Sequence, residues 1–222
     1  MNNPENIKPD SRRPIAARNT GWADRIARWL ARTGMTPNQI SVASMVFGVL
    51  AAGLFFWTAA RFGELSIWTR GAFLIGAIIA IQMRLLCNLF DGMVAVEGGK
   101  GAKDGPFWNE FPDRVADLAI FAGVGYAAGV PELGWAVGGL AVMAAYVREL
   151  GRAVGLDADF VGPMAKQHRM AFLCLGTLIA CFEYLWSWQG EILFITLIII
   201  AIGTAVTIIR RSIRQVRALK KQ

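Results

Sequence analysis

Long apolar blocks alternate with short polar stretches along most of this sequence. Each block has about 20 residues or more, the length that a helix needs to cross the hydrocarbon core of a bilayer. We therefore predict an all-α, polytopic membrane protein with six transmembrane helices, the last two joined by a tight hairpin at Gly190. The predicted spans are residues 41–60, 71–97, 110–129, 134–154, 169–188 and 190–212.

A different pattern precedes the first span. The large apolar residues Trp22, Ile26 and Trp29 fall on one helical face, and charged residues cover most of the rest. This pattern predicts a short amphipathic helix that lies in the membrane interface and ends at Gly34. The predicted divisions are a polar tail, this interfacial helix, the transmembrane catalytic domain and a basic tail, over residues 1–18, 19–34, 35–212 and 213–222.

Composition and charge also favour a membrane protein. Apolar residues make up 55% of the 222 residues and charged residues 18%, against roughly 45–50% and about 25% in ordinary soluble domains. These values exclude a disordered chain and argue against a soluble enzyme, which would have one core instead of six apolar spans. The net charge of +7 suits either nucleic acid or an anionic membrane surface. Because Lys and Arg flank the apolar spans, we favour the membrane and predict no nucleic-acid partner.

Lys and Arg are concentrated on one side of the predicted spans. Seven precede the first span and six lie at or beyond the end of the last, whereas only Arg61 and Arg70 fall on the opposite side. The positive-inside rule therefore places both chain ends in the cytoplasm, as an even number of spans requires. We expect a multi-pass protein of the inner (cytoplasmic) membrane with its polar cavity on the cytoplasmic side.

The most informative polar residues lie at the cytoplasmic ends of the second and third predicted spans. Two share one face of the second span, and three recur every four residues along the third. Because a short loop joins these helices, they run antiparallel and their polar faces can meet. Converging carboxylates and amides suit a hard cation such as Mg²⁺, while a polar contact between helices is the plainer alternative. The five residues are Asn88, Asp91, Asn109, Asp113 and Asp117.

The spacing of these residues resembles the motif of the CDP-alcohol phosphotransferases, also called CDP-alcohol phosphatidyltransferases. That motif is D-x2-D-G-x2-A-R-x8-G-x3-D-x3-D, and the chain has the same intervals from Asn88 to Asp113. The run from Thr36 to Asn38 also resembles the start of the family's first span. The resemblance extends from residue 20 to the end and implies a metal-dependent transferase that uses Mg²⁺ or Mn²⁺.

The chain departs from the motif in three places. Two of the four aspartates are replaced by Asn88 and Asn109, and the arginine by Val96. Asparagine offers a metal its carbonyl oxygen but no charge, so we expect weaker metal binding or a single ion. Asp117 lies one turn beyond Asp113 and allows a second register, in which these two form the final pair. A YnbA-like subgroup has the same Asn-Glu-x2-Asp-x3-Asp run, and the chain resembles that variant.

The resemblance implies roles for these residues. Asp91 and Asp113 would hold the metal with help from Asn88 and Asn109, and Asp117 would be a supplementary ligand. The last aspartate of the motif is the family's general base on the acceptor hydroxyl. This role falls on Asp113, or on Asp117 in the second register. The residues implied to admit the nucleotide are Pro37, Asn38, Gly92, Ala95 and Gly105.

A second group of polar residues lies between the fourth and fifth predicted spans. A helix that begins near Pro163 would add its N-terminal N–H groups to these side chains and form an anion site. In the family, basic residues here face the phosphate of the acceptor, and the alternative is an ordinary positive-inside loop. The group consists of Arg148, Arg152, Lys166, His168 and Arg169.

The resemblance thus implies transfer of a phosphatidyl-type group from a CDP-linked lipid, such as CDP-diacylglycerol, to an alcohol with release of CMP, in phospholipid biosynthesis. The basic group favours a phosphorylated alcohol such as glycerol phosphate or inositol phosphate, and serine stays open. The resemblance also implies a homodimer in the lipid bilayer. The alternatives are a non-catalytic relative that binds CDP-lipid or a divalent cation, and a small transporter, for which the sequence lacks two related halves with interrupted helices.

Overall fold

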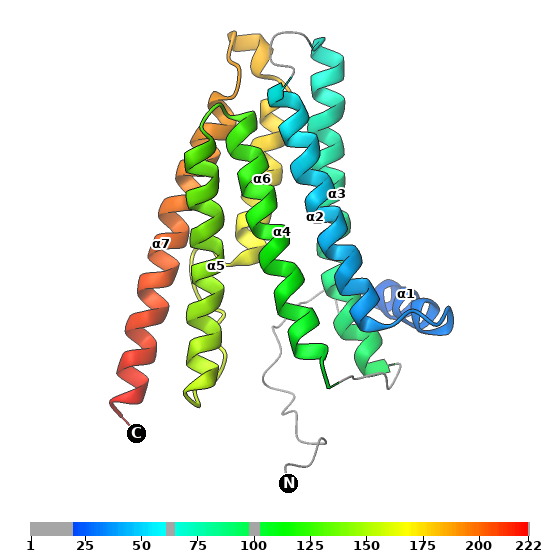
Figure 1. Ribbon diagram of the computed structural model, residues 1–222, viewed down its shortest axis with the longest axis vertical. Helices are drawn as coiled ribbons and strands as arrows, with labels where there is room; N and C mark the ends of the chain where they lie inside the picture. The colour runs from blue at the N-terminus through cyan, green and yellow to red at the C-terminus, as the bar shows by residue number, and fades with distance from the viewer. Residues whose placement is uncertain (1–19, 61–64, 98–102, 222) are drawn as a thin grey trace.

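The computed structural model describes residues 20–60, 65–97 and 103–221. Every regular element within these ranges is a helix, and the helices form an elongated bundle with α1 across one end (Figure 1). The predicted polar tail, residues 1–18, lies outside the described residues. The elements are α1 (Gly21–Arg32), α2 (Pro37–Ala60), α3 (Ile67–Glu97), α4 (Gly105–Ala127), α5 (Pro131–Ala153), α6 (Lys166–Ala180), the 3₁₀ helix η3 (Glu183–Trp186) and α7 (Glu191–Leu219).

Four of the described helices, α2, α3, α5 and α7, are long and apolar enough to cross a membrane. The all-helical membrane fold is therefore confirmed at this level. Helix α4 does not qualify because its first half carries several charged side chains, and α6 has only 15 residues. The six-span arrangement and the interfacial position of α1 remain predictions.

Helix α4 packs mainly against α2 and α5. Small residues permit this close packing. A Cβ added at Gly123 would lie 2.6 Å from the backbone oxygen of Ala52 in α2, and one added at Gly125 would lie 2.6 Å from the Cα of Gly134 in α5. Helices in membranes approach closely where such residues face each other. The contact holds the polar first half of α4 beside the first turns of α2.

Helix α1 is attached to the bundle through a separate apolar cluster. Its Ala23 and Ala27 are fully buried and join a cluster that includes Leu89 and Phe90 of α3. The helix ends at Arg32, and Gly34 follows with a left-handed φ of 84°. This end agrees with the one predicted from the sequence, because glycine adopts such a conformation without strain.

The connection between α6 and α7 differs from the prediction. The expected span 169–188 is interrupted because α6 ends at Ala180 and η3 follows. The carboxylate of Glu183 is fully buried and accepts bonds from the backbone N–H groups of Gly190 (2.9 Å) and Ile192 (2.6 Å). It also accepts a bond from Arg70 at 2.8 Å. The predicted tight hairpin at Gly190 is therefore wrong, because this buried acid draws the chain into a longer connection and caps α7.

Candidate functional site

The motif residues gather toward the end of the bundle that carries α1 and the C-terminal end of α7 (Figure 1). The site is built from the first turns of α2, the last turns of α3, the first half of α4 and the first turn of α6. Asn88 Nδ2 of α3 donates to Asp113 Oδ1 of α4 at 2.9 Å. The polar faces of the two helices therefore meet, as their antiparallel arrangement led us to expect.

Asp113 is surrounded by donors from three helices. Its Oδ1 accepts from Asn88 and, at 3.1 Å, from Arg84 Nη2. Its Oδ2 accepts from Lys166 Nζ and lies 3.5 Å from Arg114 Nη2. Both oxygens of this carboxylate are therefore next to cations. At 9% exposure, the residue still reaches the surface of the protein.

Asp117 lies one turn deeper and is completely enclosed. It is 0% exposed, as is Arg84, and the two form an ion pair at 2.7 Å. Its other oxygen lies 3.4 Å from Nη2 of the buried Arg169. Arg169 is held in turn by the backbone oxygen of Met164 at 3.0 Å. Asp117 is thus the centre of a buried charge network between α3, α4 and α6.

Asp91 has a different environment from the other two aspartates. Its Oδ2 accepts from Ser41 Oγ at 2.8 Å and its Oδ1 from the backbone N–H of Gly92 at 2.6 Å. Ser44 makes a parallel contact one turn along α2, where its hydroxyl lies 2.6 Å from Asn88 Oδ1. Among the ion pairs of the described ranges, none includes Asp91, so its charge is met by neutral donors.

The residues implied for the nucleotide lie beside this cluster at the starts of α2 and α4. Asn38 Nδ2 donates to Asp104 Oδ2 at 3.1 Å, and Trp108 Nε1 donates to the same oxygen at 3.0 Å. A Cβ added at Gly105 would meet open space. Gly92 and Ala95 are partly buried on α3, and so is Pro37 at the start of α2. Asn109 is exposed on α4.

The residues implied for the acceptor divide into two groups. Lys166 and Arg169 are buried in the first turn of α6 and point into the aspartate cluster. Arg148 bonds to Glu110 and Glu149, and the exposed Arg152 bonds to Glu149 at 3.1 Å. His168 is exposed on α6. Helix α6 begins at Lys166, slightly later than the predicted start near Pro163.

Two residues of the cluster, Ser41 and Ser44, are not among those selected from the sequence, and Arg84 is on the polar face of the second predicted span but has no role assigned there. Ser41 and Ser44 lie three residues apart on α2, where they follow the Thr36–Asn38 run. Arg84 lies one helical turn before Asn88 on the same face of α3. An arginine inside a long apolar helix is itself a signal, because such a charge is costly in a membrane without a partner.

The donor set suits a hard divalent ion, because it offers carboxylate and amide oxygens. The described ranges contain no group of three or more His, Cys, Asp or Glu residues arranged to hold a metal by themselves. Cations already flank Asp113 and Asp117, whereas Asp91 is bound only by a hydroxyl and a backbone N–H among the described contacts. Of the three aspartates, Asp91 is therefore the one whose carboxylate is most available to a divalent ion.

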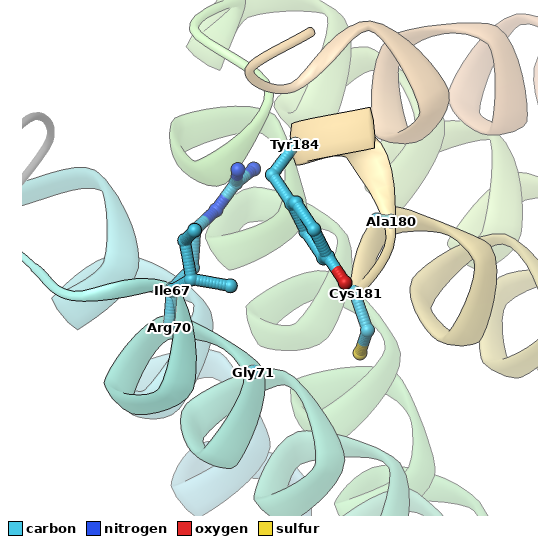
Figure 2. Close-up of a pocket in the computed structure, with 6 residues that line it drawn as sticks. All are labelled: Ile67, Arg70, Gly71, Ala180, Cys181 and Tyr184. Carbon is cyan, nitrogen blue, oxygen red and sulfur yellow. The ribbon is translucent and has the colours of Figure 1, made fainter. Parts of the chain in front are cut away.

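A small pocket lies at the other end of the bundle, between the start of α3 and the end of α6 (Figure 2). The Arg70 side chain in this pocket is bound to Glu183. Because the start of α3 is far along the helix from Asp91, this pocket belongs to no part of the aspartate cluster. Its lining residues are Ile67, Arg70, Gly71, Ala180, Cys181 and Tyr184.

Known proteins with similar sequences include phosphatidylinositol phosphate synthases. No family model matches the chain. The chain is 28% identical over 193 residues to the phosphatidylinositol phosphate synthase of Streptomyces avermitilis, covering 83% of this chain and 74% of that protein. It is 24% identical over 194 residues to the phosphatidylinositol phosphate synthase of Mycolicibacterium smegmatis, covering 84% and 80%.

Two solved structures with a similar fold are also of a phosphatidylinositol phosphate synthase. A crystal structure of Mycobacterium tuberculosis phosphatidylinositol phosphate synthase in complex with manganese and citrate has a TM-score of 0.71 at 20% identity, covering 87% of this chain and 88% of that one. The same synthase with CDP-DAG bound has a TM-score of 0.69 at 21% identity, covering 85% and 90%.

Motif spacing, fold and relatives point to one class of protein. The chain resembles the CDP-alcohol phosphatidyltransferases in motif spacing, sequence and fold, and its long apolar helices are those of an integral membrane protein. Within that class, the relatives named above are phosphatidylinositol phosphate synthases. Membership of the narrower YnbA-like subgroup remains a prediction.

Proposed function

We propose that this enzyme transfers a phosphatidyl-type group from a CDP-linked lipid to a phosphorylated alcohol of the inositol phosphate class, with release of CMP. The observation that carries the choice of acceptor is the position of Lys166, a buried ammonium group in contact with the motif carboxylate Asp113. A phosphate held by Lys166 would bring the hydroxyl groups of the same molecule beside that carboxylate. The relatives named as phosphatidylinositol phosphate synthases support the same class of acceptor.

The proposed cofactor is Mg²⁺ or Mn²⁺. Asp91 would hold it and Asn88 and Asn109 would supply amide oxygens, whereas Asp113 and Asp117 are already paired with cations. When bound, such an ion neutralises the charge of the donor diphosphate and stabilises phosphoryl transfer. The similar fold that was solved with manganese supports this choice.

Burial favours Asp113 over Asp117 as the proposed general base. A base must come within hydrogen-bond reach of the acceptor hydroxyl. Asp113 is 9% exposed, whereas Asp117 is enclosed between Arg84 and Arg169. Asp113 would accept the hydroxyl proton as the oxygen attacks the phosphorus that carries the lipid. Asp117 would then keep Arg84 and Arg169 in place.

The nucleotide is proposed to lie along the starts of α2 and α4. The contact between Asn38 and Asp104 holds these two helix ends together. The open space at Gly105 and the small residues Gly92 and Ala95 would let a nucleotide approach the backbone. A nucleotide at this position would lie near Asp91, where we propose that the diphosphate of the donor binds.

The active site is proposed to face the cytoplasm. Helix α1 and the basic C-terminal end of α7 lie at the same end of the bundle as the aspartates (Figure 1). Arg25, Arg28 and the last turns of α7 supply positive charge there, which suits the cytoplasmic membrane surface. The exposed side chains of Trp22 and Trp29 on α1 suit a position in the membrane interface. A homodimer remains an expectation from the family resemblance.

Release of CMP from CDP-diacylglycerol tests the proposal directly. Purified protein in detergent would receive the donor, Mg²⁺ or Mn²⁺, and either inositol phosphate, glycerol phosphate, inositol or serine. We expect metal-dependent CMP release with inositol phosphate and not with inositol, which is the matched acceptor without the phosphate. Asp91→Asn should remove this activity. Release only with unphosphorylated alcohols would refute the proposed acceptor class.

A non-catalytic relative that binds nucleotide-lipid is the second candidate. The cations on both oxygens of Asp113 favour it, because they oppose both metal binding and proton acceptance. It predicts that labelled CDP-diacylglycerol binds the protein but yields no CMP with any of the four acceptors. That outcome would replace the transferase proposal for this chain.

A further inference from the structure

The charge balance of the buried cluster is unusual for a metal site. Its carboxylates are Asp91, Asp113 and Asp117, and the cations against them are Arg84, Arg114, Lys166 and Arg169. These three negative and four positive side chains carry a net charge of +1, and Glu110, which lies 3.5 Å from Arg114, brings the balance to zero when it is included. A cluster with that balance has little electrostatic attraction left for divalent ions, apart from the carboxylate that the cations do not contact.

Arg84 is the one cation that contacts two of these carboxylates through a single nitrogen. Its Nη2 lies 3.1 Å from Asp113 Oδ1, 2.7 Å from Asp117 Oδ1 and 3.2 Å from the backbone oxygen of Asp113. Its Nη1 lies 3.6 Å from the sulfur of Met170 in α6. The side chain is 0% exposed and comes from the middle of α3. The guanidinium is therefore held rigidly between α3, α4 and α6.

We propose that Arg84 is a positioning residue that acts as a fixed internal cation: it binds Asp113 and Asp117 permanently and restricts the site to one divalent ion at Asp91. The inference rests on the proposed metal-dependent transfer and deepens it. On the side of Asp113 that faces α3, the guanidinium of Arg84 and the amide of Asn88 both donate to Oδ1, so this oxygen is already bound by two groups of the protein.

The sequence departures around the motif agree with this role. Where the family motif has aspartate, this chain has Asn88, whose Nδ2 donates to Asp113 at 2.9 Å. An aspartate at that position would instead repel Asp113. Arg84 stands one turn earlier on the same face. Loss of a carboxylate and presence of a guanidinium both reduce the negative charge at the same point, so they have the same effect on metal binding.

Manganese titration of the substrate-free protein tests the inference without relying on catalysis. The signal of free Mn²⁺ in electron paramagnetic resonance gives the number of bound ions and their affinity. We expect one Mn²⁺ per chain in the unmodified protein. Arg84→Met should bind Mn²⁺ at least about tenfold more tightly, or bind a second ion, because the removal of a buried cation makes the charge beside Asp113 and Asp117 more negative by one unit. Arg84→Lys should behave like the unmodified protein.

The matched control is Arg70→Met at the opposite end of the bundle. Arg70 also forms an ion pair with a fully buried acid, Glu183, at 2.8 Å. Its removal should lower the melting temperature and leave Mn²⁺ binding unchanged. A purely structural role for Arg84 predicts the same pattern for Arg84→Met. If that variant does not fold, Arg84→Gln keeps an amide donor and should still bind Mn²⁺ more tightly.

Two results would overturn the inference. One is binding of two Mn²⁺ ions per chain by the unmodified protein. The other is an unchanged Mn²⁺ affinity in folded Arg84→Met or Arg84→Gln protein. Failure of the proposed function is distinguishable from both, because it would be seen as absent CMP release while the gain in Mn²⁺ affinity on removal of Arg84 persists.

Discussion

Replacement of Glu183 by alanine should destabilise the protein without impairing its chemistry. The carboxylate is fully buried and accepts bonds from Arg70 and from the backbone N–H groups of Gly190 and Ile192. Its removal leaves these two N–H groups and one arginine without their acceptor. Bonds to charged groups contribute about 1.5–3 kcal/mol each and are not additive, and breaking a buried ion pair costs about 3–5 kcal/mol.

We expect a loss of about 3 kcal/mol for Glu183→Ala, at the lower end of that range. The reason is that the Arg70 side chain is 21% exposed and can regain water when its partner is removed. For a chain of this size, each kcal/mol corresponds to about 2–4 °C in melting temperature, so the expected decrease is about 6–12 °C.

Thermal unfolding in detergent, followed by tryptophan fluorescence, would measure this decrease. The matched control is Glu191→Ala, because Glu191 is a nearby glutamate at the same helix end but is exposed. It should shift the melting temperature by less than about 2 °C, as surface substitutions usually cost under about 0.5 kcal/mol. CMP release by Glu183→Ala well below its melting temperature should match the unmodified protein. A shift as small as that of the control would refute the capping role of Glu183.

Three further predictions concern the site and the packing around it. Lys166→Met should raise KM for inositol phosphate by roughly 10- to 100-fold with little change for CDP-diacylglycerol, because a charge-assisted bond to phosphate contributes about 1.5–3 kcal/mol; equal increases for both substrates would contradict this. Asp113→Asn should reduce kcat at least about 100-fold, because a general base usually contributes that much, whereas Asp117→Asn should retain measurable turnover. If steady-state assays give the opposite ranking of these two variants, the base is Asp117. Gly123→Ala should lower the melting temperature by several degrees, because its new Cβ would lie 2.6 Å from a backbone oxygen of α2 and such overpacking costs about 1–3 kcal/mol. Gly139→Ala is the control: its new Cβ meets open space, so the melting temperature should stay unchanged.

Much of the helical architecture could be predicted from hydrophobic pattern alone. The predicted spans 41–60, 71–97, 110–129 and 134–154 each fall on one helix of the structure, with ends that differ by a few residues. Those helices are long, and a long apolar run has few alternatives to a helix in a membrane. The failure at 169–188 has a local cause. A single glutamate looks like an interruption at the end of an apolar run, and nothing in the pattern reveals that Glu183 folds back to cap α7.

The motif spacing predicted which residues of α3 and α4 would come together, but not what would surround them. Positions on one helical face follow directly from the helix period, so the contact between Asn88 and Asp113 could be expected. The partners on α2 and α6 could not, because Ser41 and Lys166 are far from these residues in the sequence and their placement depends on how α2 and α6 pack. The basic group between the fourth and fifth spans divides for the same reason. Lys166 and Arg169 begin α6 and reach the aspartates, whereas Arg148 and Arg152 bond to glutamates.

The position of Lys166 and Arg169 suggests how a site with two fewer aspartates than the family motif can still transfer a phosphoryl group. Catalysis of this reaction depends on neutralising phosphate charge at a fixed place more than on forming covalent bonds to the protein. A divalent ion held by many carboxylates is one way to supply positive charge. Lys166 and Arg169, held against Asp113 and Asp117, are another, because an ammonium or guanidinium in a buried position can bind an anionic substrate as it enters. Asp113, the less enclosed of the two aspartates, would still be within reach of the acceptor hydroxyl, whereas Asp117 would keep the cations in place. The buried cations beside Asp113 and Asp117 would thus supply part of the positive charge that a site with fewer motif carboxylates holds less well as a metal ion.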